Sequence, residues 1–116
     1  MRRILGIETL GGGRFLVQTE EGDAFPMYKG ELRHYGIREG EELGEESFRE
    51  IMEELLPNRA KKKALHLLER MDRTETQLRQ KLTELRYPKE IVEEAVSYVK
   101  SFHYIDDVRY ARQYIE

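Results

Sequence analysis

The chain has 116 residues, of which 37% are charged, and its formal net charge is −3 at pH 7. It contains no cysteine, which excludes a disulfide framework and every reaction that needs a thiolate. No apolar run approaches the roughly 20 residues of a membrane-spanning helix, and the first residues lack the apolar stretch of a signal peptide. The composition therefore predicts a cytoplasmic protein with no membrane partner.

The two halves of the chain differ in the sign of their charge. Residues 1–58 carry 7 basic and 13 acidic residues, a net charge of −6, whereas residues 59–116 carry 13 basic and 10 acidic residues, a net charge of +3. Such a change of sign suggests two units that face different surroundings. An ordinary solvated helical surface also explains a charge of +3, which is far below that of a dedicated nucleic-acid-binding domain.

The first 43 residues are expected to form a small antiparallel β-unit. Its predicted strands are residues 2–10, 14–19 and 24–29. Residues 11–13 and 20–23 separate them and suit hairpin loops, because their glycines accept the positive φ of tight turns. Pro26 cannot donate a hydrogen bond to a neighbouring strand, so the third strand should lie at an edge or form a bulge. Residues 29–43 are expected to form a turn or short helix and then return toward the sheet.

From Glu45 onward, apolar residues recur with the period of a helix. A first helix should reach Pro57, which ends it, kinks it or opens the next helix. The further predicted helices are residues 59–71, 75–86, 89–102 and 106–116. Thr74 and Gln77 have the spacing of a helix capping box. The fold class is therefore α+β, with a β-rich unit over residues 1–43 and a helical repeat region over residues 44–116.

The helical region contains an internal repeat. Shifting the chain by 47 residues places Ala64 on Ala111 and Leu67 on Tyr114, and helical repeats commonly have such lengths. Residues 59–102 would then form one three-helix repeat and residues 106–116 the start of a second. Because the apolar face of this last helix lacks partners, we expect either a fragment of a longer chain or self-association through the C-terminal helix.

No enzyme signature is found in the sequence. His34, His66 and His103 are not paired at metal-ligand spacing and do not lie beside an obvious nucleophile. Asp106 and Asp107 form a carboxylate pair, but an N-cap and a first-turn carboxylate near the positive end of a helix dipole account for both. We therefore expect no catalytic residue, no metal ion and no cofactor.

The clearest candidate site is a basic ridge on the second predicted helix. The ridge consists of Arg59, Lys62, His66, Arg70 and Arg73. The apolar side of the same helix consists of Ala60, Ala64, Leu67 and Met71. The fourth helix has an acidic outward side with Glu90, Glu93 and Glu94, and faces of opposite charge can orient docking to a polyanion or an acidic groove. An ordinary soluble helix surface explains the ridge as well.

Two segments resemble the RecX family of recombinase regulators. The first resembles the family's first repeat, through residues 64–70, 73–75, 78 and 81–82. The second, residues 102–116, resembles the family signature, in which a glycine-tyrosine-leucine/isoleucine-aspartate-aspartate turn precedes a helix with tyrosine/phenylalanine-alanine. His103 stands where the family often has glycine, and residues 87–88 replace a glycine-containing turn. Residues 1–43 resemble the β-rich extension of some members.

The resemblance implies a non-catalytic protein that binds the RecA recombinase filament on single-stranded DNA. Such a protein modulates, and usually inhibits, strand exchange and the coprotease activity of the filament, and it contacts the DNA only indirectly or weakly. The signature positions carry over to Asp106, Asp107, Tyr110 and Ala111, whose expected roles, like that of Thr74 in the capping box, are architectural. Two alternatives remain open: a helix-turn-helix-like module that binds nucleic acid directly, or a helical repeat adaptor for another protein.

Overall fold

The structure is a computed structural model that describes residues 1–70 and 74–101, without the side chain of Arg70. The chain divides into two compact units, Met1–Glu54 and Leu55–Glu116. The predictions for residues 102–116, including those for Asp106, Asp107, Tyr110 and Ala111, lie outside the described residues, as does Arg73.

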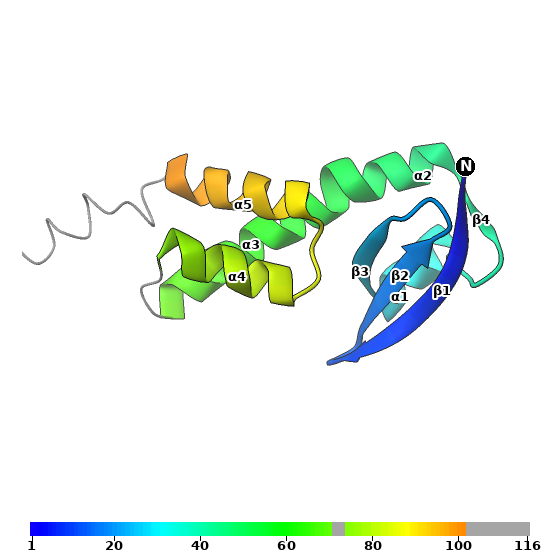
Figure 1. Cartoon of the computed structure of the whole chain (residues 1–116), viewed down its shortest axis with the longest axis horizontal. Coiled ribbons are helices and arrows are strands. Elements are labelled where there is room, and N and C mark those ends of the chain that lie inside the picture. The colour runs from blue at the N-terminus through cyan, green and yellow to red at the C-terminus, as the bar shows by residue number, and fades with distance from the viewer. Residues whose placement is uncertain (71–73, 102–116) are drawn as a thin grey trace, which may run out of the picture. The chain divides into compact units, whose positions relative to one another are not determined.

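A four-stranded antiparallel sheet forms the first unit, with the strand order β3-β2-β1-β4 (Figure 1). The strands are β1 (Arg2–Gly11), β2 (Arg14–Thr19), β3 (Ala24–Tyr28) and β4 (Glu42–Leu43). The long pairing of β1 with β2 runs from Ile4 opposite Thr19 to Gly11 opposite Arg14. Strand β4 pairs only with Arg2 and Arg3, so most of β1 has a strand on one side alone.

The predicted loops of this sheet are confirmed. Gly11, Gly12 and Gly13 have φ values of 88°, 60° and 76°, which side chains other than glycine rarely adopt. Pro26 lies in β3 at an edge of the sheet, where its missing N–H removes no bond from the interior. The region that follows contains helix α1 (Lys29–Tyr35) and then β4. This agrees with the short helix and the return toward the sheet that were expected for residues 29–43.

The sheet and the helical segment that follows it share one apolar core. This core consists of Ile4, Leu16, Val17, Phe25, Met27, Ile37, Leu43 and Ile51, all at most 5% exposed. The helical segment comprises α2 (Glu45–Glu50) and the π-helix η1 (Ile51–Leu55). Phe48 of α2 packs edge-on against Phe25, with ring centroids 6.1 Å apart. Arg2 lies over the Phe48 ring, with its guanidinium carbon 4.4 Å from the Phe48 centroid.

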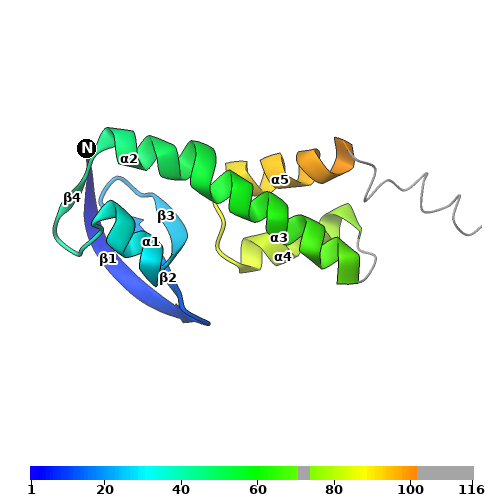
Figure 2. The same cartoon turned by 180° about the vertical axis from the view of Figure 1, so that it is seen from behind.

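The second unit contains three helices, α3 (Leu56–Arg70), α4 (Glu75–Glu84) and α5 (Lys89–Ser101), which pack on one another (Figures 1 and 2). Pro57 lies in the first turn of α3, one of the outcomes expected for it. Helix α4 ends before the predicted residue 86, because Arg86 has a left-handed backbone with φ of 73°.

The core of the second unit has the predicted helical periodicity. Its buried residues are Leu56, Ala60, Ala64 and Leu67 from α3, Leu78 and Leu82 from α4, and Ile91, Val92, Ala95, Val96 and Val99 from α5. Burying a Val, Leu or Ile side chain typically stabilises a fold by about 1.5–3 kcal/mol. The small residues Ala60 and Ala64 allow α5 to approach α3 closely. This packing fixes which side of α3 faces solvent, and thereby positions the candidate site.

Candidate macromolecular interface

On the solvent side of α3, next to the exposed carboxylate of Glu69, the predicted ridge has two exposed side chains, Lys62 and His66. They are four residues apart and therefore lie one turn apart on the same helix face. Ala60, Ala64 and Leu67 are buried on the opposite side, as the periodicity predicted. Within the described part of the chain, Lys62 and His66 form no hydrogen bond or ion pair. Both side chains are therefore available to a partner without a hydrogen bond or ion pair to another described residue being broken.

The other predicted ridge residues differ in availability. Arg59 is half-buried and already interacts with other groups of the chain. Arg70 belongs to the last turn of α3, and Arg73 is outside the described residues. The described part of the ridge is therefore centred on Lys62 and His66.

A neighbouring lysine has an internal role that periodicity did not reveal. Lys61 Nζ lies 3.1 Å from Glu94 Oε2 and 5.1 Å from the centre of the Tyr98 ring, so it joins α3 to α5. Lys61 and Lys62 differ by one position and hence by about 100° around the helix. One lysine thus faces α5 while the other faces solvent.

Helices α4 and α5 are joined by a network of four charged groups. Arg79 Nε donates to Glu93 Oε2 at 2.6 Å, and its Nη2 donates to Glu93 Oε1 at 3.0 Å and to Glu75 Oε2 at 3.1 Å. Lys100 Nζ lies 2.9 Å from Glu75 Oε1. The Arg79 guanidinium lowers the pKa of Glu93, and Lys100 together with Arg79 lowers the pKa of Glu75.

This network weakens the charge contrast that the sequence suggested. Of the three predicted acidic residues on α5, Glu93 pairs with Arg79 and Glu94 with Lys61, while Glu90 is exposed. The positive charge of Arg79 is likewise satisfied inside the unit. The Glu75–Arg79 pair was detectable in the sequence, because residues four apart on a helix are neighbours. The pairs between helices were not, because they depend on how the helices pack.

The described residues include exposed hydrogen-bond donors but no metal-binding cluster. No group of three or more His, Cys, Asp or Glu side chains among them is arranged to hold a metal ion. None of the helices described here is both long enough and apolar enough to cross a membrane. The exposed Lys62 and His66 can donate hydrogen bonds to phosphate or carboxylate oxygens of a partner.

Comparisons with known proteins point to one family. Residues 60–98 match the family model described as RecX, first three-helix domain. The chain is similar to regulatory protein RecX of Clostridium acetobutylicum, with 30% identity over 71% of this chain and 38% of the relative. It is also similar to regulatory protein RecX of Caldanaerobacter subterraneus subsp. tengcongensis, with 36% identity over 70% of this chain and 41% of the relative.

A solved structure agrees with these sequence relatives. The crystal structure of a regulatory protein RecX superposes with a TM-score of 0.52 and 28% sequence identity, covering 99% of this chain and 57% of that chain. This match includes the β-rich unit as well as the helices. The chain spans 38% and 41% of the length of the two curated relatives described above.

Proposed function

Because the chain belongs to the RecX family, we propose that it is a non-catalytic regulator that binds a RecA-type recombinase filament on single-stranded DNA. In this proposal it modulates, and usually inhibits, recombination and the coprotease activity of the filament. Because the chain would bind the assembled filament, its own contact with the single-stranded DNA would be indirect or weak. The relatives are named as regulatory proteins, which favours a role exerted by docking rather than by chemistry.

One observation carries the choice of contact surface. Lys62 and His66 are exposed and unpaired on α3 within the described residues, inside the segment that matches the family's first three-helix domain. The exposed ammonium group of Lys62 can attract an acidic groove or a phosphate backbone over roughly 10 Å at moderate ionic strength. We therefore propose the ridge around these two residues as the filament contact.

The test of this function is a comparison of three targets. Binding of the chain is measured by fluorescence anisotropy on labelled single-stranded DNA, on labelled duplex, and on the RecA filament assembled on the same single strand. The proposal predicts binding to the filament that is at least about tenfold tighter than to either naked DNA. Equal binding to filament and naked DNA would refute it.

The same assay distinguishes the direct nucleic-acid module. Such a module neutralises several phosphates, and its affinity for naked DNA should therefore fall steeply and linearly with the logarithm of the salt concentration. A filament regulator should bind naked DNA weakly throughout the salt series. A strand-exchange assay with RecA then establishes whether the bound chain inhibits or stimulates the reaction.

A further inference from the structure

The outer edge of β1 is open over most of the strand. Strand β4 covers only Arg2 and Arg3. Ile4 also bonds outward, because its N–H donates to Glu41 O and its C=O accepts from Gly40 N–H, each at 2.8 Å. Beyond this point no strand of the described chain lies beside the outer edge, which continues to Gly11.

Ile7 and Thr9 present their backbone groups to this open edge. The N–H of Ile7 points outward, because it donates to the Glu39 side chain and not to β2. Backbone groups alternate in direction along a strand, so the N–H and C=O of Thr9 point outward as well. Thr9 is exposed to solvent. The edge therefore offers the alternating donors and acceptors that an added strand needs.

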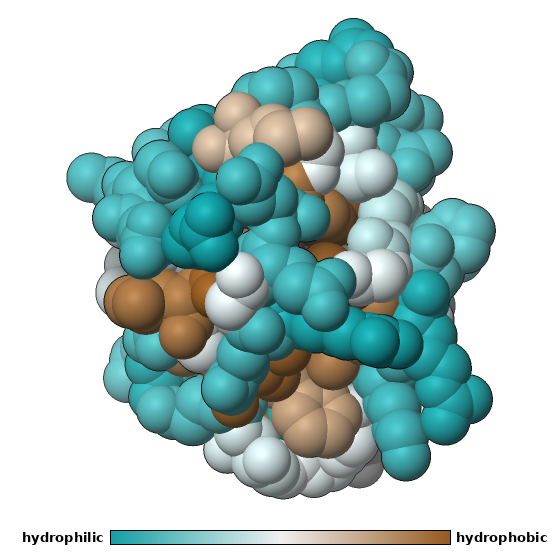
Figure 3. All heavy atoms as spheres, turned by 90° about the vertical axis from the view of Figure 1, so that its right-hand side faces the viewer, coloured by the Kyte–Doolittle hydropathy of each residue, from teal (hydrophilic) through white to brown (hydrophobic). Residues whose placement is uncertain are grey.

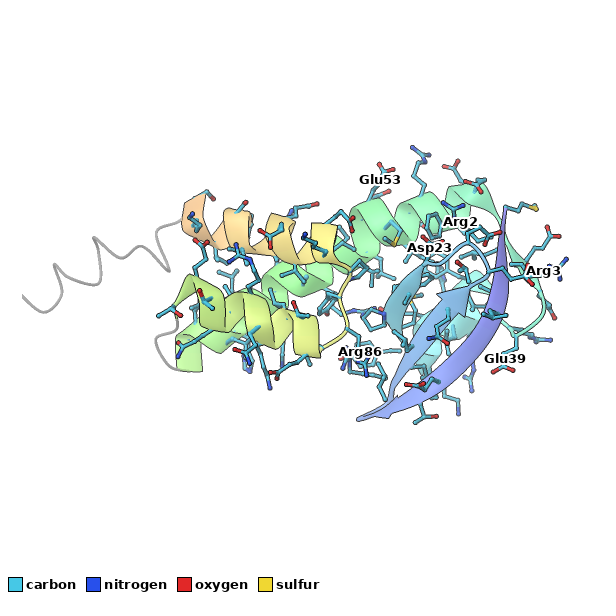
Figure 4. All side chains as sticks on the ribbon, viewed as in Figure 1. Arg2, Arg3, Asp23, Glu39, Glu53 and Arg86 are labelled. Carbon is cyan, nitrogen blue, oxygen red and sulfur yellow. The ribbon has the colours of Figure 1, made fainter. Side chains whose placement is uncertain are left out.

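The Glu39 side chain supplies one hydrogen-bond acceptor where a neighbouring strand would supply a carbonyl oxygen. Its Oε1 accepts from the Ile7 N–H at 3.0 Å, as a carbonyl oxygen of a neighbouring strand would. Figure 4 shows Glu39 beside β1 on the side away from β2. A single flexible side chain protects the strand edge less well than a neighbouring strand, because the backbone of an added strand forms several hydrogen bonds in register. After its displacement, the Glu39 carboxylate would lie beside the added strand.

The surroundings of the edge are acidic. Glu8, Glu39 and Glu41 are exposed and outnumber the exposed Arg38 next to Glu39, and no cation among the described residues forms an ion pair with any of the three carboxylates. Arg3, in contrast, is held by Gly40 O at 2.8 Å and by Glu42 Oε1 at 3.3 Å, so its charge is largely satisfied. The carboxylates thus favour a positively charged occupant.

An exposed apolar side chain lies at one end of the same edge. Leu5, at the bulge of β1 next to Gly6, is 62% exposed. Figure 3 views this side of the molecule and shows brown hydrophobic groups between teal hydrophilic ones. An added strand can therefore place alternate side chains against apolar and acidic groups.

We propose that the open edge of β1 from Gly6 to Gly11 binds an extended segment rich in lysine or arginine from a partner protein. The segment adds a fifth strand to the sheet, takes the Ile7 N–H from Glu39, and places its basic side chains beside Glu8, Glu39 and Glu41. This surface belongs to the first unit. The proposal that it binds a basic segment is independent of the filament contact proposed for α3.

The probe for this surface is a fluorescein-labelled octapeptide in which lysine and threonine alternate, since threonine favours extended backbone. Its binding to the full chain is measured by anisotropy. A matched peptide with glutamate in place of lysine tests the charge, and a lysine–threonine peptide N-methylated at alternate residues tests the backbone pairing. We expect both control peptides to bind at least about tenfold more weakly.

Two protein variants localise the binding. Thr9→Pro removes an outward N–H without removing a bond to β2, and should lower peptide affinity about tenfold. Glu39→Gln removes one charge at the edge and should also weaken binding. Its matched control, Glu53→Gln, removes the same charge from η1, away from the edge (Figure 4), and should have no effect. Circular dichroism and thermal unfolding verify that each variant is folded.

Three results would overturn the proposal. Equal binding of the N-methylated peptide to the unchanged chain would show a purely electrostatic contact, whatever the stability of the Thr9 variant. Absence of saturable binding would show that Glu39 only protects the edge from aggregation. A dimer in sedimentation that Thr9→Pro dissociates would assign the edge to a second copy of the chain.

Discussion

Arg79 on α4 and Glu93 on α5 form a two-point ion pair, in which Nε and Nη2 of the guanidinium each donate to a different carboxylate oxygen, at 2.6 and 3.0 Å. Glu75 joins the same guanidinium at 3.1 Å and is itself held by Lys100. The pair links the two helices that follow α3, in the domain that carries the proposed filament contact.

The network predicts a loss of stability in acid. Arg79 lowers the pKa of Glu93, and Lys100 and Arg79 lower the pKa of Glu75, from an ordinary value of 4.5. The unfolded chain therefore binds these protons at a higher pH than the folded chain does. The stabilisation is fully present above pH 4.5 and is lost as the pH falls through the lowered pKa values.

Arg79→Met should reduce this pH dependence and lower the stability slightly at neutral pH, because the pair is partly exposed to solvent. Urea unfolding at a series of pH values from 6 down to about 3 measures both effects. Glu90→Gln removes an exposed carboxylate from the same α5 and should leave the slope nearly unchanged. An equal change of slope in both variants would show that general charge, not the pair, governs the response.

A second prediction concerns the start of α4. Thr74 Oγ1 accepts from the Gln77 N–H at 3.1 Å, and Gln77 Oε1 accepts from the Thr74 N–H at 2.9 Å, which confirms the predicted capping box. Thr74→Ala should cost about 1 kcal/mol of unfolding free energy, whereas Thr74→Ser should cost much less. Thr76→Ala, two residues into the helix, is the control. Denaturant unfolding that finds Thr74→Ala as stable as this control would contradict a role for the cap.

A third prediction concerns the end of α4. Arg86 has φ of 73°, a left-handed conformation that is unfavourable for a residue with a Cβ atom. Arg86→Gly should therefore raise the unfolding free energy by about 0.5–1 kcal/mol. Arg86→Ala retains the strain and should bring no such gain, which separates the backbone effect from loss of the charge. If thermal unfolding shows that the Arg86→Gly variant is no more stable than the Arg86→Ala variant, relief of backbone strain is ruled out.

The sequence predicted those elements in which local chemistry decides the structure. The glycines at 11–13 required a tight turn, and the spacing of Ala60, Ala64 and Leu67 defined the buried side of α3. The left-handed Arg86 was missed because a helix end at a residue other than glycine has no clear local signal. Instead, the chain leaves the helix before Pro88, which restricts the residue in front of it.

Features that depend on packing could not be predicted in the same way. Neither the pairing of Lys61 with Glu94 nor that of Arg79 with Glu93 follows from a repeat in one helix, because each joins residues on two helices. The open edge of β1 was also invisible, since the sequence indicates strands but not that β4 stops after pairing with Arg2 and Arg3. The candidate ridge was therefore predicted as a helix face, and the structure shows that Lys62 and His66 are exposed whereas Arg59 already has internal interactions.

The last prediction concerns that ridge. Lys62 and His66 are exposed and make no contact that holds the fold within the described residues, so Lys62→Glu combined with His66→Glu should change stability by less than about 0.5 kcal/mol. Binding to the recombinase filament should nevertheless weaken, because the change places negative charge where the proposed partner is acidic. Slower association should account for part of the defect, which should shrink as salt is added.

The control for the ridge variant must reverse a charge without breaking an internal pair. Glu94 is unsuitable because it binds Lys61, whereas Lys89, an exposed lysine at the start of α5, forms no ion pair among the described residues and acts on Glu93 only through the field of its charge. Lys89→Glu should preserve filament binding, and the negative charge suits the first turn of a helix. Anisotropy on the assembled filament compares the two variants at several salt concentrations, and thermal unfolding verifies their stability. Intact binding in the ridge variant, or an equal loss in Lys89→Glu, would show that the ridge is only a solvated helix face and that the filament is bound elsewhere.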